Sequence, residues 1–76
     1  MTLNHIKPGE SCTIMSVNAA GALRRRLFDM GLTPGAEIKM RKLAPLGDPM
    51  EISLRGYELS MRKAEAAMVE VDRAMS

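Results

Sequence analysis

The segment KLAPLGDPMEISLRGYELSMR, residues 42–62, holds the most informative pattern in this chain of 76 residues. In two runs separated by a short Gly-containing turn, every second residue is apolar: Met50, Ile52, Leu54, Leu59 and Met61. A period of two is typical of β-strands that bury one face. The segment therefore predicts a tight antiparallel hairpin preceded by a proline-rich insert.

Two further strands are predicted upstream of this hairpin. EIKMRKL, residues 37–43, alternates apolar with charged residues, and SCTIMSV, residues 11–17, alternates apolar with small polar ones. TPGA, residues 33–36, fits a type II turn, because proline presets φ at the second position and glycine supplies the positive φ of the third. In the N-terminal lead-in, residues 1–9, Leu3 and Ile6 are expected to pack against the core.

The stretch AGALRRRLFDMGL has a different period. Leu23, Leu27 and Met30 are spaced i, i+4 and i+7, which places them on one stripe of an α-helix. Gly31 suits the left-handed conformation that ends a helix, and Leu32 is expected to fold back onto Leu27. The pattern predicts one helix with a well-defined C-terminus.

The C-terminal part of the chain completes the fold prediction. Residues 63–67 are rich in helix formers but leave room for only one turn before the alternating MVEV, so a one-turn helix and a last strand are expected. A longer terminal helix is the alternative. The predicted fold is mostly β: a five-stranded antiparallel barrel that closes to remove its edges, with one α-helix near residues 20–30. We expect a single domain over residues 1–76, with a short flexible tail after about residue 72.

The amino-acid composition indicates which broad class of protein this is. The chain is 46% hydrophobic and 26% charged, which is the balance of a folded domain. No apolar run reaches the ~18 residues needed to span a bilayer, and the N-terminal residues lack a secretory pattern. Cys12 is the only cysteine, so no internal disulfide is possible. A cytoplasmic location is expected, and the net charge of +2 is too small to demand a nucleic-acid partner.

Catalytic and metal-binding chemistry are not expected. The chain has one histidine, His5, and one cysteine, Cys12, with no triad or carboxylate pair, so no catalytic residue is assigned. No cluster of metal ligands with helical or turn spacing surrounds His5, Glu10 or Asp48. The eight methionines include several at core-facing positions, where they fill gaps in packing. No metal site and no cofactor are predicted.

The proline-rich insert is the candidate contact site. Pro45 and Pro49 restrict its backbone, while Gly47 and Asp48 supply turn chemistry. Together they would hold Leu46 on a preorganised tip, where it is available to a partner. The alternative, left equally open by the residues, is that Leu46 folds back over the end of the barrel.

The densest charge in the chain is Arg24-Arg25-Arg26. On a helix, three consecutive side chains spread over about 200°, so they do not form one patch. A solvated helix face is one interpretation, and a contact surface that includes Arg24 and Arg25 is the other. Phe28 and Tyr57 are the only aromatic residues, which argues against base stacking and against grooves for proline-rich peptides.

These motifs also resemble a known family. LFDMGLTPG, residues 27–35, followed by PLGDP, residues 45–49, and the Gly56-Tyr57 turn are similar to the signature of the FeoA family of small ferrous iron transport accessory proteins. The similarity extends from Ile6 to Val71. The first two of these motifs, spaced and in the same order as in the family, are more specific together than either alone.

The resemblance implies an SH3-like barrel. It also implies a cytosolic partner, the G-protein domain of the ferrous iron transporter FeoB, which would place the protein at the inner face of the membrane. Related barrels occur in iron-dependent repressors of the DtxR type, where they follow a helix-turn-helix domain, so repressor activity is not expected here.

Together with this resemblance, the sequence leads us to expect a non-enzymatic adaptor that regulates this transporter and modulates its GTP turnover. The partner-binding residues expected are Leu46, Pro45, Asp48, Arg24 and Arg25. The alternative is a nucleic-acid-binding or metal-responsive regulatory small barrel. Binding to DNA or RNA that persists above ~200 mM salt would favour the alternative, because phosphate contacts weaken steeply with ionic strength.

Overall fold

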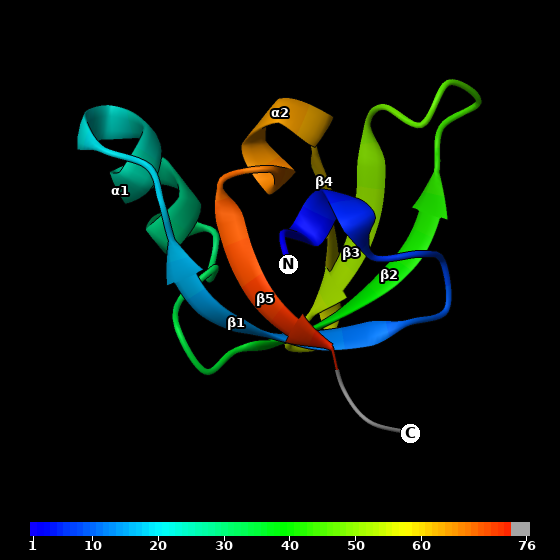
Figure 1. Cartoon of the computed structure of the whole chain (residues 1–76), viewed down its shortest axis with the longest axis horizontal. Helices are drawn as coiled ribbons and strands as arrows, with labels where there is room; N and C mark the ends of the chain where they lie inside the picture. Colours follow the sequence, from blue (N-terminus) through cyan, green and yellow to red (C-terminus); the bar gives the residue numbers. More distant parts are fainter. Residues whose placement is uncertain (74–76) are drawn as a thin grey trace.

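The computed structural model describes residues 1–73. Within them the chain forms five strands, two α-helices and a short 3-10 helix (Figure 1). In chain order these are η1 (Leu3–His5), β1 (Ser11–Val17), α1 (Gly21–Asp29), β2 (Glu37–Leu43), β3 (Met50–Leu54), β4 (Tyr57–Met61), α2 (Lys63–Ala66) and β5 (Val69–Arg73). Arg73 is the last residue of β5, and the tail predicted after about residue 72 otherwise falls on residues 74–76, which lie outside the described residues.

The five strands form one antiparallel sheet with the order β4-β3-β2-β1-β5. This confirms the mostly-β prediction, with one helix near residues 20–30 and a short helix before the last strand. The alternative of a longer terminal helix is wrong, because α2 has only four residues. The expected closure of the barrel is not formed: β4 and β5 remain the two ends of the sheet in the part of the chain that the structure describes.

The buried apolar side chains form one hydrophobic core on the inner face of the curved sheet. Its buried side chains come from every strand, from both α-helices and from the lead-in, where Leu3 and Ile6 are almost fully buried as predicted. Met40, Met50 and Met61 are each at most 1% exposed, so these methionines pack in the core. No polar or charged residue is buried within residues 1–73. The core is therefore an ordinary apolar one and holds no polar network.

Helix α1 ends as its sequence predicts. Gly31 has φ +98, the Leu32 N–H donates to the Leu27 carbonyl at 3.1 Å, and the Gly31 N–H donates to the Phe28 carbonyl at 2.9 Å. These two hydrogen bonds define a Schellman motif. Leu27 and Leu32 are both fully buried, whereas Leu23 and other apolar residues of α1 are only partly buried. The cap thus fixes the direction in which the chain leaves the helix.

The remaining turns follow from their residues. Arg55 and Gly56 both have positive φ, at +51 and +86, as a two-residue hairpin turn between twisted strands requires. In β2, the register with β3 shifts between Met40 and Lys42, which marks a β-bulge. The bulge leaves the last three residues of β2 exposed in succession, including Leu43.

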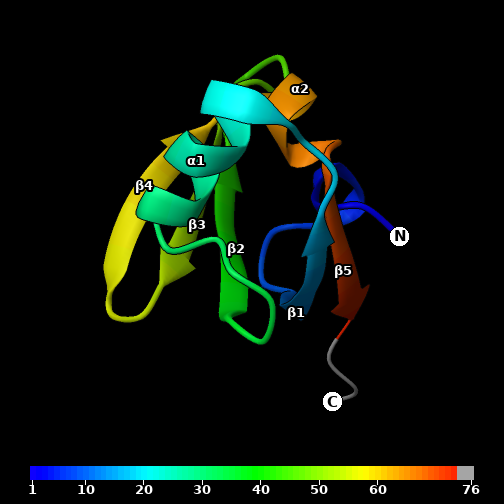
Figure 2. The ribbon, with the colours of Figure 1, turned by 90° about the vertical axis from the view of Figure 1, so that its left-hand side faces the viewer.

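Both helices and the loop between β2 and β3 lie toward the same end of the molecule. Figures 1 and 2 show α1, α2 and this loop on that side of the sheet. None of the helices in residues 1–73 combines the length and the apolar character needed to cross a membrane.

Candidate partner-binding surface

Leu46 is the most exposed large apolar side chain described, with 94% of its surface accessible. The interpretation in which it folds back over the barrel is therefore wrong. Pro45 beside it is also exposed. An apolar side chain presented in this way loses solvent-exposed surface only when another molecule covers it.

The loop that carries Leu46 is closed by backbone hydrogen bonds. The Ala44 N–H donates to the Pro49 carbonyl at 3.0 Å, and the Gly47 N–H donates to the Ala44 carbonyl at 2.7 Å. Gly47 has φ +81, a conformation that favours glycine. These contacts hold the tip in one shape, so little conformational freedom remains to be lost on binding.

Asp48 ties this loop to α2. Its Oδ1 accepts a hydrogen bond from the backbone N–H of Lys63 at 2.9 Å. Lys63 is the first residue of α2, where backbone donors lack partners within the helix. Among the residues predicted to contact a partner, Asp48 therefore also has a structural task, which is to link the loop with the second helix.

Asp48→Ala is expected to lower the free energy of unfolding by about 0.5–2 kcal/mol, because it removes an acceptor at the start of a helix. Asp48→Asn keeps an acceptor oxygen and is expected to lose less. Urea denaturation of the three proteins measures the difference. Equal stability of all three would show that the contact to Lys63 contributes nothing.

The arginines of α1 have three different environments. The guanidinium of Arg24 lies 4.8 Å from the ring centroid of Phe28, within the range of a cation–π contact. Arg25 is exposed and forms no ion pair with residues 1–73. Arg26 pairs with Glu65 of α2 at 2.7 Å. Of the three, Arg24 and Arg25 keep their charge available to a partner.

The Arg26–Glu65 pair is a feature that the sequence analysis missed. Glu65 also accepts a hydrogen bond from the backbone N–H of Arg62 at 3.1 Å, so it caps α2 and anchors α1 at once. A glutamate three residues after the N-cap residue, as Glu65 is after Arg62, is typical of a helix start, so the cap could have been predicted from the sequence. Nothing in the sequence signals its pairing with Arg26.

A shallow groove of 350 Å³ connects the base of the loop to both helices. It is lined by Arg26, Pro49, Ser60, Met61, Arg62 and Glu65. The loop tip, this groove and the exposed arginines of α1 thus belong to one end of the molecule (Figure 2). Figure 1 draws α1 and the loop on opposite sides of that end, and Arg24 and Arg25 are not among the residues that line the groove.

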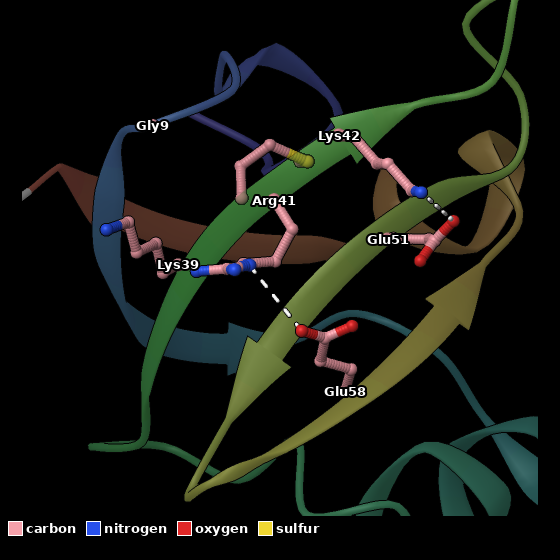
Figure 3. A pocket seen from close by; sticks show the side chains of 7 residues that line it. Gly9, Lys39, Arg41, Lys42, Glu51 and Glu58 are labelled. Carbon is pink, nitrogen blue, oxygen red and sulfur yellow. Dashed lines mark ion pairs between the residues drawn. The ribbon is translucent and has the colours of Figure 1, made fainter.

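The outer face of β2 forms a second shallow pocket, of 290 Å³, shown in Figure 3. Arg41 pairs with Glu58 at 3.6 Å, and Lys42 pairs with Glu51 at 3.7 Å. All four side chains are more than a third exposed, so these pairs contribute little to stability. With mixed charge and no buried polar group, this face resembles an ordinary solvated sheet surface.

Cys12 lies in the core and is 1% exposed. Burial, and to a lesser degree the charge of Glu10, raises the pKa of its thiol to about 11. The thiolate, which is the reactive and metal-binding form, is therefore disfavoured at neutral pH. His5 is exposed, and its Nδ1 lies 3.1 Å from the Thr2 hydroxyl. Residues 1–73 contain no group of three or more His, Cys, Asp or Glu side chains arranged to hold a metal ion.

Comparison with known proteins extends these observations. The FeoA domain family model matches residues 1–73. The Fe(2+) transport protein A/Fe(2+) transporter FeoB fusion protein of Porphyromonas gingivalis is 33% identical over 72 residues, which are 95% of this chain and 8% of that relative. This chain thus spans only a small part of that much longer protein.

Two solved structures are similar throughout. The solution structure of FeoA from Chlorobium tepidum has a TM-score of 0.91 and 43% identity, and the match covers 99% of this chain and 71% of that one. FeoA from Stenotrophomonas maltophilia, a procaryotic SH3 domain protein complexed with zinc, has a TM-score of 0.83 and 30% identity, covering 95% and 89%. These likenesses confirm the SH3-like fold. Since the family model matches nearly the whole sequence, this chain belongs to the FeoA family.

Proposed function

We propose that this protein is a non-enzymatic accessory of ferrous iron transport that binds the cytosolic G-protein domain of a FeoB-type transporter. The observation that carries the proposal is the relative in which a ferrous transport protein A and the transporter FeoB form one polypeptide. Fusion holds two modules at a high effective concentration, which is useful when the modules act on each other. Modules that act on each other need a contact surface whether or not they share one polypeptide.

The exposed end of the barrel supplies such a surface. Leu46 offers an apolar anchor on a closed loop, and Arg24 and Arg25 add positive charge on α1. Buried apolar anchors supply much of the free energy of an interface, whereas charges around them mainly direct approach and orientation. We therefore assign Leu46 and Pro45 to the centre of the contact and the two arginines to its rim. Asp48 holds the loop in place through its hydrogen bond to Lys63.

A regulatory task fits this surface better than catalysis. The groove beside the loop is shallow, and the Cys12 thiol is buried with a raised pKa, so the described residues offer no activated nucleophile. Binding to the G-protein domain would change GTP turnover only through differential affinity for its nucleotide states. The proposal places the protein at the cytosolic face of the membrane whenever it is bound to the transporter.

Titration of the isotope-labelled protein with a purified FeoB-type G-protein domain tests the proposal. Amide signals are followed with the domain free, GDP-bound and bound to a non-hydrolysable GTP analogue. We expect saturable shifts in residues 44–50 and around Arg24 and Arg25, with different affinities in different nucleotide states. The absence of shifts at saturating concentration in every state would contradict the proposed interaction.

A further inference from the structure

The two ends of the sheet are protected differently. At the β5 end, the N-terminal residues cover the strand: Thr2 forms a bridge with Glu70, and the Val71 N–H donates to the Met1 carbonyl at 2.8 Å. At the other end, β4 pairs only with β3 among the described strands, and Figure 2 shows it as the outermost strand on its side. The edge of β4 is therefore the open edge of the sheet.

The register identifies the unpaired backbone groups of β4. Leu54 and Tyr57 flank a two-residue turn, so they form a pair that exchanges hydrogen bonds between the strands. Pairs alternate along an antiparallel ladder, and Leu59 opposite Ile52 is the next pair of this kind. The N–H and C=O groups of Glu58 and Ser60 consequently point away from β3. An added strand would find four backbone hydrogen-bonding groups there.

This edge lacks three of the devices that hinder strand addition, namely a proline, a lysine and a bulge. Tyr57–Met61 contains no proline and no lysine, and its register with β3 is continuous. By contrast, the pairings of β1 with β5 and of β2 with β3 each contain a register shift. Bulges, prolines and lysines are among the features with which natural sheets hinder pairing at an open edge. The β4 edge is thus suited to pairing with another chain.

The charges around the edge define the chemistry of the occupant. Arg55 precedes β4 and Arg62 follows it; both are exposed, and neither forms an ion pair with any residue in the described range. The one carboxylate on the strand, Glu58, lies 3.6 Å from Arg41 and is thereby partly neutralised. The strand is flanked by free positive charge at both ends, which is complementary to an acidic segment.

The space beside the strand is open at its C-terminal half. The 350 Å³ groove is lined by Ser60 and Met61 of β4, by Arg26 of α1 and by Pro49 at the base of the Leu46 loop, among others. A segment paired with Ser60 would therefore run into the same end of the molecule that presents Leu46. The edge and the proposed contact surface are continuous.

We propose that β4 receives an acidic, extended segment of the transporter's cytosolic G-protein domain as a sixth strand. This inference rests on the proposed function, which supplies the partner, and adds the mode of recognition. Backbone hydrogen bonds to Glu58 and Ser60 provide binding, while Arg55 and Arg62 select acidic side chains. Strand addition of this kind is a recurring form of peptide recognition.

Amide hydrogen exchange tests the backbone contacts. The isotope-labelled full chain is measured alone and with an excess of the purified G-protein domain. The amides of Glu58 and Ser60 are expected to exchange fast in the free protein and roughly tenfold or more slowly in the complex, because they become donors in a ladder. Contacts made by side chains alone would leave these two amides unprotected.

A proline variant tests the same contacts by affinity. Ser60→Pro removes an N–H that points away from β3, so the fold is expected to survive, as checked by a thermal melt. Affinity for the G-protein domain is expected to fall roughly tenfold or more relative to Ser60→Ala, which keeps the donor. Arg73→Pro places a proline on the opposite edge strand and is the control for general effects of proline; it is compared with Arg73→Ala, since both variants lose the Arg73–Glu10 ion pair. Arg62→Glu is a second variant that leaves the ladder intact and is expected to weaken binding about threefold or more.

The outcomes separate this inference from the proposed function. If the wild type binds but the Glu58 and Ser60 amides stay unprotected and Ser60→Pro binds like Ser60→Ala, strand addition is overturned and the proposed function stands. If these amides become protected without partner as the protein concentration rises, a second copy occupies the edge and the inference is overturned. If the wild type does not bind the G-protein domain at all, both proposals fail.

Discussion

Gly31→Val is expected to lower the free energy of unfolding by about 3 kcal/mol or more, because it combines backbone strain with a steric clash. Gly31 has φ +98, which a β-branched residue rarely adopts. A Cβ at this position would also lie 3.0 Å from Leu54 Cδ2 and 3.0 Å from the Tyr57 hydroxyl. Tyr57 donates a hydrogen bond to the Met30 carbonyl, so its side chain cannot move away without losing that bond. Urea denaturation measures the loss.

Gly35→Val is the matched control for this variant. Gly35 has a similar φ, +91, but apart from its two chain neighbours no residue has an atom within 4 Å of a Cβ built there. Its replacement is expected to cost only the backbone strain, about 1–3 kcal/mol. The difference between the two variants reports the close packing of the α1 cap against β3 and β4. If both variants lost the same free energy of unfolding, the side chains of Leu54 and Tyr57 would be able to move aside without cost.

Leu46→Asp is expected to weaken binding to a FeoB-type G-protein domain by about 30-fold or more while leaving the stability within ~0.5 kcal/mol of the wild type. Binding weakens because a carboxylate would have to be desolvated at the centre of the contact. Stability is retained because the side chain is 94% exposed and contributes no packing to the core. Isothermal titration and thermal melts measure the two quantities separately.

Met15→Asp provides the control for this second variant. Met15 is also exposed, at 55%, but lies on β1, away from the loop between β2 and β3 (Figure 1). Met15→Asp introduces the same charge as Leu46→Asp, and this variant is expected to bind the G-protein domain like the wild type. If Leu46→Asp bound as tightly as the wild type, the loop tip would not be the anchor, and the contact would have to lie elsewhere on the barrel.

Local patterns were sufficient where the physical cause is local. The strand at 50–54 was predictable from alternating apolar residues, since a strand exposes successive side chains on opposite faces. The end of α1 was predictable from Gly31 and Leu32, because the cap involves only neighbouring residues. The family could be recognised for the same reason, as its motifs mark turns and caps that this fold requires.

The sequence misled where several local solutions were possible. Alternating strands with short connections are compatible both with a closed barrel and with an open curved sheet, and closure was the wrong choice here. The choice depends on how the sheet twists and on what covers its edges, and here Met1 and Thr2 cover one of them. That contact joins residues at opposite ends of the chain, which no short-range pattern reveals.

By itself, then, the sequence determined the strands, the helix, the cap of α1 and the composition of the core, because burial periods and turn residues act over a few positions. Only the tertiary structure decided that Leu46 points to solvent, since both orientations suit the same loop sequence. It also decided that Asp48 bonds to Lys63 across 15 positions and that Arg26 pairs with Glu65 across 39. These contacts depend on where the sheet places distant segments, and that placement is a property of the packed core as a whole.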